Sequence, residues 1–487
     1  MTSTDKILEA TPGSVERAPE PNKLRGDLNT FQLLFGILAF NGPLVGVMAF
    51  LPLAIGYGNG LGAPAAYIAA AVILGVFASG FLKMSRHVDN PGGFYSYVTL
   101  GLGKELGLGA SFLAVVAYYT VLLGMYALMG VLISVYVAGT LGGPDIAWWI
   151  WAGILQVVVG IFGFFNIELS ARVLTVFMCC EAILILAYNA AVVVQGGAAG
   201  LSGSSFLPSH IFSGGVGIAL LFALLSFTGF EVTAVFRDEV RDPDRTIPRA
   251  AYGHIALVGI GYAVSTWVII QAIGPASAVA ATASDPTGSV TATVQTYLGA
   301  VAVDLVSILL MTSGFASLLA GHNILARYLF NLGVDGVLPR PIGAAHARHG
   351  SPYRAAILAS GLIGAGYVLS VIARPDPSIL YAQLWGVFGL ALQILFLLTT
   401  VAIMVFMWRA RPEDATLWHR LVAPGLALVG LGTTMVLAVS NIELLIPGEV
   451  AVTITVVVLV GSIVAGGAYA RLLKTVRPAA YRHIGRR

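Results

Sequence analysis

The sequence carries little charge, since only 10% of its 487 residues are Asp, Glu, Lys or Arg. Soluble domains carry about 25%, so the composition excludes an ordinary water-exposed globular protein. Apolar residues make up 57% of the chain and recur in long runs. Because about 20 consecutive apolar residues cross a bilayer as a helix, the composition predicts a polytopic helical membrane protein.

Cysteine is scarce as well. Cys179 and Cys180 are neighbours inside one apolar run, so the chain has no disulfide framework, and we expect both to be inert packing thiols. The sequence also lacks a GxxxxGK[ST] phosphate-binding loop, a metal-ligand cluster and a nucleophile–base pair. These absences argue against an ATP-driven pump and against an enzyme. We expect no organic cofactor, no metal and no nucleic-acid partner.

The apolar runs form twelve candidate spans. If the N-terminus lies inside, every lysine and arginine except Arg374 falls on the inner side, which is the bias of cytoplasmic loops. The sequence therefore predicts twelve transmembrane helices in a cytoplasmic membrane, with both termini in the cytoplasm. The predicted spans are 31–57, 64–83, 110–139, 146–165, 173–195, 214–237, 250–274, 300–331, 353–372, 379–408, 421–441 and 450–472.

The loops on the two sides differ. Residues 1–30 are polar and Pro-rich, which predicts a disordered cytoplasmic tail without a cleavable signal peptide. Inside, residues 91–97 predict a short interfacial helix, and the alternating charges of residues 237–249 predict an ion-pair latch. The outer loops are rich in Gly, Ala, Ser and Thr and are predicted to be flexible connectors: 139–144, 196–209 and 274–288.

The first span is interrupted at its centre by a glycine and a proline. Pro43 lacks the N–H that a helix needs and crowds the preceding turn, while Gly42 and Gly46 loosen the backbone. Unpaired backbone at membrane depth is tolerated only where it is buried in protein or lines a polar cavity. The pattern indicates a broken helix that presents backbone groups to a ligand, with a simple proline kink as the alternative.

A second interruption lies in the sixth span, at residues 225–231. Gly229 weakens a helix by about 1 kcal/mol relative to alanine, and the hydroxyls of Ser226 and Thr228 can satisfy the backbone groups that a break releases. Interrupted segments at matching places in two halves are typical of the binding site of a secondary transporter. Because five spans separate the two breaks, the halves are predicted to be inverted repeats.

This reading divides the chain into five parts. The N-terminal tail is followed by a first repeat with spans 1–5 and a second repeat with spans 6–10. Two accessory spans and a basic cytoplasmic tail complete the chain. The predicted boundaries are 1–30, 31–210, 211–410, 411–472 and 473–487.

Three motifs beside these spans resemble the amino acid–polyamine–organocation (APC) transporters of the LeuT-like fold. They are Asn90-Pro-Gly-Gly-Phe-Tyr-Ser-Tyr97 with Gly101-Leu-Gly-Lys104, Ser226-Phe-Thr-Gly-Phe-Glu231 with Ile247-Pro-Arg-Ala250, and Arg327 with Asp335-Gly336-Val-Leu-Pro339. The resemblance covers the first ten spans. It implies an all-α amino acid permease with discontinuous helices 1 and 6. The first break departs from the Gly-Ser-Gly or Gly-Ala-Gly run that many relatives have.

The ends of broken helices offer N–H groups for a carboxylate and carbonyls for an ammonium group. The predicted substrate contacts are Asn41, Gly42, Pro43, Leu44, Val45 and Gly46 from the first break, Leu225, Ser226, Phe227, Thr228 and Phe230 from the second, and Tyr118 from the third span. The resemblance implies a gating role for the two phenylalanines, with core or lipid-facing positions as the alternative. It also places Tyr118 in the cavity, where an interfacial position is the alternative. Tyr381 and Trp385 are expected in the outer aromatic belt.

Asp304 lies near the outer end of the eighth predicted span, whereas two carboxylates lie deep within their spans. Such groups are costly in a membrane and mark ion or proton paths, so Glu181 and Glu231 are candidate proton carriers. Glu181 could instead bind sodium or the substrate amine, or have a structural role; Glu231 could cap the released backbone. The resemblance makes Ser313 and Ser317 candidates for a sodium site. We expect proton coupling, with Na⁺ as the alternative ion.

The sequence thus predicts a secondary active transporter that imports amino acids or related amines by alternating access. Exchange of amino acids or amines and polyamine transport are the alternatives, and a channel is the competing class. The predicted partners are a small-molecule substrate and the lipid bilayer. The protein is expected to be a monomer or a homodimer.

Overall fold

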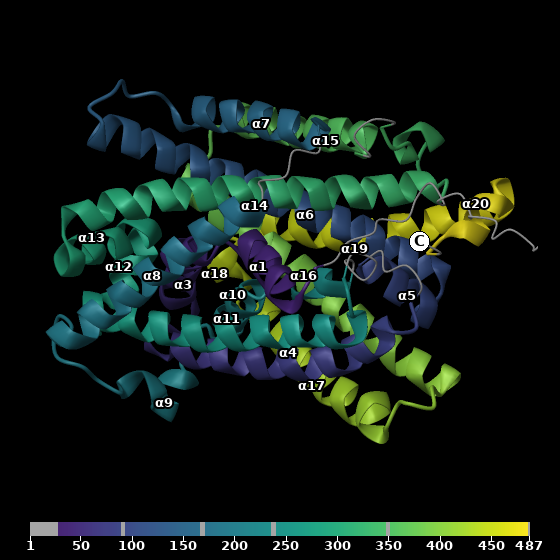
Figure 1. The fold of residues 1–487 in the computed structure, drawn as a ribbon, viewed down its shortest axis with the longest axis horizontal. Coiled ribbons are helices and arrows are strands. Elements are labelled where there is room, and N and C mark those ends of the chain that lie inside the picture. The colour runs from purple at the N-terminus through teal and green to yellow at the C-terminus, as the bar shows by residue number, and fades with distance from the viewer. Residues whose placement is uncertain (1–27, 89–92, 166–170, 235–239, 347–350, 486–487) are drawn as a thin grey trace, which may run out of the picture.

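The computed structural model is a bundle of helices whose long members run side by side (Figure 1). It describes residues 28–88, 93–165, 171–234, 240–346 and 351–485. Within these ranges there is no β-strand, and one isolated bridge joins Leu28 to Val240. The all-helical prediction is confirmed. The predicted N-terminal tail lies almost entirely outside the described residues.

The first span begins with α1 (Thr30–Asn41), which is capped by the side chain of Asn29. The helix α1 ends at Gly42, whose φ of 56° lies in the left-handed region that favours glycine. The chain then resumes helical structure as α2 (Pro43–Val45), the π-helix η1 (Gly46–Phe50), α3 (Leu51–Leu53) and η2 (Ala54–Asn59). Non-helical backbone at Gly58 and η3 (Gly60–Gly62) lead into the second span.

Long helices make up the rest of the bundle. They are α4 (Ala63–Ser85), α6 (Lys104–Val135) with η4 (Tyr136–Thr140), α7 (Trp148–Phe165), α8 (Ala171–Gln195), α11 (Pro243–Ile273), α14 (Ala300–Val334), α15 (Tyr353–Ala373), α16 (Pro377–Ala410), α17 (Ala423–Ser440) and α19 (Glu449–Val476). The sixth span is split into α10 (Val216–Leu225) and η6 (Phe230–Ala234). The short α18 (Ile442–Leu445) joins the last two long helices.

Ten helical stretches of the described chain are long and apolar enough to cross a membrane. One of them, Pro43–Ser85, contains the non-helical backbone at Gly58, and α10 is too short to be counted. The structure therefore confirms a multi-pass membrane protein.

The loop after α11 was expected to be a flexible connector, and this expectation is wrong. It folds into α12 (Ala278–Ser284) and α13 (Pro286–Leu298), which lie at the same end of the bundle as η5 (Ser204–Phe206) and α9 (Pro208–Ile211) (Figure 1). The local start signals of α13 explain the difference: Asp285 accepts from Gly288 N–H, and Pro286 occupies the first turn. Tyr57 Oη donates to Ala283 O at 3.3 Å, so α12 contacts the end of the first span.

The opposite end of the bundle carries α5 (Phe94–Leu102) and α20 (Pro478–His483) (Figure 1). The short helix predicted at residues 91–97 is present from Phe94 onward, and residues 91–92 lie outside the described ranges. The turn η8 (Arg340–Gly343) follows α14. A second hydrophobic cluster, separate from the main core, is buried here: Tyr95, Leu108, Leu332, Val337, Ala470, Leu473 and Ile484.

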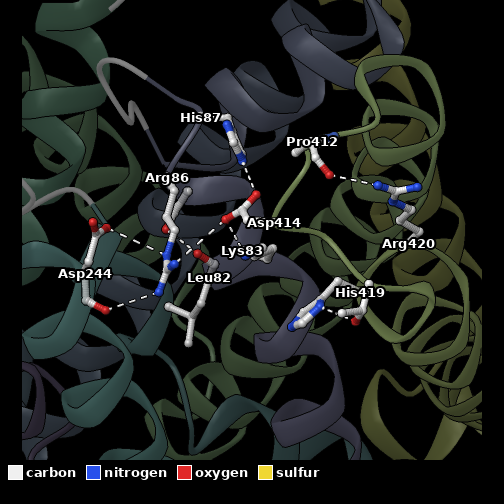
Figure 2. A network of polar contacts seen from close by, with 11 residues as sticks. Leu82, Lys83, Arg86, His87, Asp244, Pro412, Asp414, His419 and Arg420 are labelled. Atoms are coloured by element: carbon white, nitrogen blue, oxygen red, sulfur yellow. Dashed lines mark hydrogen bonds and ion pairs between the residues drawn. The ribbon is translucent and has the colours of Figure 1, made fainter.

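A charged network joins α4 to the loop between α16 and η9 (Trp418–Val422) (Figure 2). Asp414 of this loop contacts Lys83, Arg86 and His87, and Arg86 also lies 3.7 Å from Asp244. The predicted latch of residues 237–249 therefore reaches across to α4, although residues 237–239 lie outside the described chain.

Cys179 and Cys180 are exposed on α8, so the expectation that they are packing thiols is wrong. An apolar segment alone does not reveal which of its faces is buried.

Candidate substrate-binding site

The first break is produced by the backbone chemistry of two residues. Gly42 N–H still donates to Leu38 O at 3.0 Å and so ends α1, while its left-handed φ turns the chain. Pro43 has no N–H and starts the next half-helix, a position that suits its fixed φ. Gly46 N–H donates to Gly42 O at 2.9 Å, which closes the first turn of that half-helix.

The second break is stabilised by its own side chains. Ser226 Oγ donates to Phe222 O at 2.9 Å, and Thr228 Oγ1 donates to Leu225 O at 2.5 Å. Gly229 has a φ of 111°, and its N–H donates to Glu231 Oε2 at 2.8 Å. Phe222 O and Leu225 O already accept from the backbone N–H groups of Ser226 and Thr228, so the two hydroxyls add second bonds to these carbonyls. The carboxylate of Glu231 is the side chain that pairs with an N–H of the break itself.

An asparagine joins the two breaks. Asn41 Nδ2 donates to Ser226 O at 2.5 Å across 185 residues of sequence. The same nitrogen lies 3.5 Å from Nε2 of His254, which is fully buried on α11. The two interrupted helices are therefore held together at the level of their breaks.

A cavity of about 50 Å³ lies beside this contact. It is lined by Asn41, Val45, Phe50, Val121, Leu122, Met125, Leu225, Thr228, Ser317, Gly321, Trp385 and Phe388, from the two broken helices, α6, α14 and α16. Its only polar side chains are an asparagine and two hydroxyls. No acidic or basic side chain lines it, so it can select for apolar groups beside a few fixed polar atoms.

Glu181 of α8 contacts the first break but does not line the cavity. Its Oε2 accepts from Leu44 N–H at 3.1 Å, and its side chain also bonds Ser313. Gly42 packs against the same α14 surface, because a Cβ there would lie 3.0 Å from Ser313 Oγ and 2.9 Å from Ser317 Oγ. Three of the predicted coupling residues therefore meet around the first break.

Glu231 forms a separate polar group. It is buried and lies 3.5 Å from the hydroxyl of Tyr118, whose ring is 5.5 Å from the ring of Tyr328. Neither Glu231 nor Tyr118 lines the cavity. The carboxylate both caps the second break and connects it to α6.

The structure places the other predicted residues behind the cavity wall. Phe227 and Phe230 are fully buried, and Phe230 packs against Phe77, Phe81 and Phe396 rather than lining the cavity. Both are thus inside the protein and not at its lipid surface. The predicted contacts that do line it are Asn41, Val45, Leu225 and Thr228, together with the predicted coupling residue Ser317.

Gly46 faces Tyr262 of α11. A Cβ at Gly46 would lie 2.0 Å from Tyr262 Oη, which donates to Pro43 O at 3.3 Å. The close approach of this ring to the half-helix explains why the position requires glycine.

Sequence reasoning missed most of the cavity wall. Trp385 was expected in an aromatic belt, which is wrong, because it is fully buried and lines the cavity. Phe50, Met125, Phe388 and the buried His254 were also missed. The stretches around Phe50, Met125 and Phe388 are strongly apolar, so the sequence gives no signal that would single out the inward-facing side. His254 was missed because its partner, Asn41, is distant in the sequence.

The described residues contain no group of three or more His, Cys, Asp and Glu side chains that could hold a metal ion. The chemistry available at the site is therefore that of backbone ends, amide and hydroxyl groups, two buried carboxylates and an apolar wall.

Comparison with known proteins gives one family and two distant relatives. A family model described as amino acid permease matches residues 33–475. The branched-chain amino acid permease BcaP of Lactococcus lactis subsp. cremoris (strain MG1363) is 24% identical over 347 residues, covering 67% of this chain and 70% of that protein. The uncharacterized transporter R00093 of Rhizobium meliloti (strain 1021) is 25% identical over 391 residues, covering 76% and 78%.

Proposed function

Because the chain belongs to the amino acid permease family, we propose that it is a secondary active transporter that imports small apolar amino acids. The observation that carries this proposal is the cavity between the two helix breaks. Its wall is apolar apart from Asn41, Thr228 and Ser317. An apolar side chain loses no hydrogen bond on entering such a space, whereas a charged one would be left unpaired.

The polar ends of the site suit the backbone of an amino acid. In the first turn after Pro43, Leu44 N–H is bonded to Glu181 and Gly46 N–H to Gly42 O, so the N–H of Val45, which lines the cavity, is the group we assign to the substrate carboxylate. The side-chain oxygen of Asn41, which lines the cavity, offers an acceptor for the ammonium group. The name of the Lactococcus relative, a branched-chain amino acid permease, supports the same substrate class.

We further propose that the chain crosses the membrane twelve times as a 5+5 inverted repeat with two accessory helices. Dividing the stretch Pro43–Ser85 at Gly58 and adding α10 with η6 raises the ten apolar stretches to twelve. The placement of lysine and arginine supports cytoplasmic termini, with α5 and α20 on the inner side. Transport then proceeds by alternating access to the site between the breaks.

Proton coupling is the mechanism we propose, with Glu181 and Glu231 as carriers. Both carboxylates are buried, and each bonds backbone next to a break: Leu44 N–H and Gly229 N–H. A proton gained or lost by either group therefore changes the electrostatics of a break directly. Ser313 and Ser317 beside Gly42 support sodium as the alternative ion.

Uptake into proteoliposomes tests the function. We expect saturable accumulation of a labelled branched-chain amino acid, driven by an inward proton gradient and abolished by a proton ionophore. Unlabelled apolar amino acids should compete, whereas lysine, glutamate and polyamines should not. Uptake that is indifferent to the ionophore contradicts proton coupling, and uptake that depends on a preloaded amino acid indicates exchange. Conductance without saturation would indicate a channel.

A further inference from the structure

The amide of Asn41 is held by two partners on different helices. Its Nδ2 lies 2.5 Å from Ser226 O at the second break and 3.5 Å from Nε2 of His254 on α11. The imidazole is completely buried, and it also has a hydrogen bond with the backbone of Phe227. His254 is therefore a buried polar residue beside the cavity wall, and the proposed transport cycle gives it no role.

Simple chemistry fixes the orientation of this amide. A carbonyl oxygen can only accept, so the nitrogen of Asn41, and not its oxygen, must face Ser226 O. The second hydrogen of the same nitrogen then points toward His254, which must offer a lone pair on Nε2. This requires the neutral imidazole with its proton on Nδ1. Both amide hydrogens are therefore committed to protein acceptors.

Asn41 Oδ1 is the polar atom of this side chain that remains available to a substrate. Asn41 lines the cavity, and its oxygen can only accept a hydrogen bond. We propose that His254 is a positioning residue that, by holding the Asn41 amide, keeps Oδ1 available as an acceptor for the ammonium group of the substrate. The proposal rests on the amino acid substrate of the proposed function. Through Asn41, His254 determines whether this part of the site accepts or donates a hydrogen bond.

The alternative orientation shows what His254 prevents. If the second amide hydrogen has no acceptor, the amide keeps its bond to Ser226 O but can pivot about it, which swings the unpaired N–H toward the cavity and Oδ1 away from it. A donor would then face the ammonium group, which cannot accept. Losing the hydrogen bond from the ammonium group to Asn41 Oδ1 should weaken substrate binding, because hydrogen bonds that involve a charged group are stronger than neutral ones.

The test replaces His254 with two side chains of different chemistry. His254→Leu removes the acceptor, whereas His254→Gln keeps one in its Oε1. Binding is measured for a branched-chain amino acid and for the matching 2-hydroxy acid, which keeps the carboxylate and side chain but has no ammonium group. We expect His254→Leu to weaken amino acid binding at least about tenfold and to leave the hydroxy acid nearly unchanged. His254→Gln should restore much of the preference.

A matched control is available on α14. His322 is equally buried, and its Nε2 lies 2.9 Å from Ser360 Oγ, away from the breaks. His322→Leu should leave the preference for the amino acid over the hydroxy acid unchanged. Thermal unfolding of each variant in detergent separates loss of fold from loss of recognition.

A double-mutant cycle covers the case in which His254→Leu does not fold. In an Asn41→Ala background, His254→Gln should have no effect on the preference, because the amide that it acts through is gone. An equal loss of both ligands in His254→Leu, or an undiminished preference, overturns the positioning role while the transport function stands. Failure of the wild-type protein to bind any amino acid overturns both.

Discussion

At the scale of single residues, Gly46 affects the site without lining the cavity. The sequence pattern placed its backbone among the substrate contacts, but its N–H is bonded to Gly42 O and its Cα faces the ring of Tyr262. The residue allows α11 to approach the half-helix that carries Val45. Its role is therefore one of packing.

Gly46→Ala should destabilise the protein by about 1–3 kcal/mol, the usual cost of overpacking, because its Cβ would lie 2.0 Å from Tyr262 Oη. Thermal unfolding in detergent measures this. Gly75→Ala is the matched control, since no atom lies within 4 Å of a Cβ at that position. In a Tyr262→Leu background the cost of Gly46→Ala should shrink. Equal melting temperatures of the two alanine variants would contradict the packing role.

Glu181→Gln should flatten the pH dependence of uptake. The amide can still accept from Leu44 N–H through its oxygen, so the fold of the first break is preserved while the proton site is lost. Initial uptake rates across a pH series measure the effect. Glu443→Gln, at an exposed position on α18, should retain the wild-type profile. An unaltered profile in Glu181→Gln would remove this residue from the coupling mechanism.

Backbone chemistry made part of the site predictable at this scale. Pro43 disrupts a helix and Gly42 weakens it, so the break and its neighbours Asn41 and Val45 could be found from the sequence. The walls could not, because Met125 and Trp385 lie in strongly apolar segments. His254 was missed because its partner, Asn41, is distant in the sequence.

At the scale of elements, the charged network of Figure 2 ties α4 to the α16–η9 loop. Asp414 accepts from Lys83 and also lies 3.6 Å from His87 Nε2 and 3.9 Å from Arg86. The hydrogen bond from Lys83 is the main reason that the pKa of Asp414 is lowered. About half of the Asp414 side chain is exposed, so solvent screens these pairs.

The lowered pKa gives the pH dependence its sign. The folded state holds the Asp414 proton less tightly than the unfolded state does, so the stabilisation is present at neutral pH. It begins to fade as the pH falls below the ordinary aspartate value of about 3.9 and is lost below the lowered pKa. Asp414→Asn should therefore destabilise by about 0.2–1 kcal/mol at neutral pH and low salt.

Thermal unfolding across pH and salt checks this prediction. The difference between Asp414→Asn and wild type should vanish in strong acid and diminish in high salt. Glu413→Gln, its exposed neighbour, should behave like the wild type at every pH. A difference that persists in acid would mean that packing and not charge accounts for the effect.

Element boundaries were predictable where a residue forbids helix and less so where composition only disfavours it. Gly42 ends α1 through its positive φ, and the prediction held. In the loop after α11, the abundance of Gly, Ala, Ser and Thr obscured the stronger local signal of Asp285 and Pro286, which start α13. A cap and a first-turn proline outweigh a loop-like composition.

At the scale of the whole molecule, the buried apolar side chains of the described residues form two hydrophobic clusters. The main one fills the helix bundle, and the smaller one joins α5, α6, α14 and α19 to the end of the chain. Polar contacts surround the smaller cluster: Tyr95 Oη donates to Asp335 Oδ2 at 2.7 Å and accepts from Gly485 N–H at 2.8 Å. Burial and the neighbouring Asp335 raise the pKa of Tyr95, so its hydroxyl keeps its proton.

The membrane class and the broken sixth span could be read from the sequence, because apolar length and glycine placement report directly on helices in a bilayer. The role of the C-terminal end could not. The sequence suggested only a basic cytoplasmic tail, yet Lys104 Nζ donates to Tyr481 O at 2.9 Å and to Arg482 O at 2.8 Å. Such long-range contacts leave no periodic trace in a short terminal segment.

Ile484 is the residue through which this end enters the smaller cluster, since only 1% of it is exposed. Ile484→Ala should cost about 2–4 kcal/mol, the usual range for a buried isoleucine. The matched control is Val476→Ala, because Val476 is 65% exposed. Unfolding in mixed micelles measures both. If Ile484→Ala were no more destabilising than Val476→Ala, the chain end would not contribute to the stability of the smaller cluster.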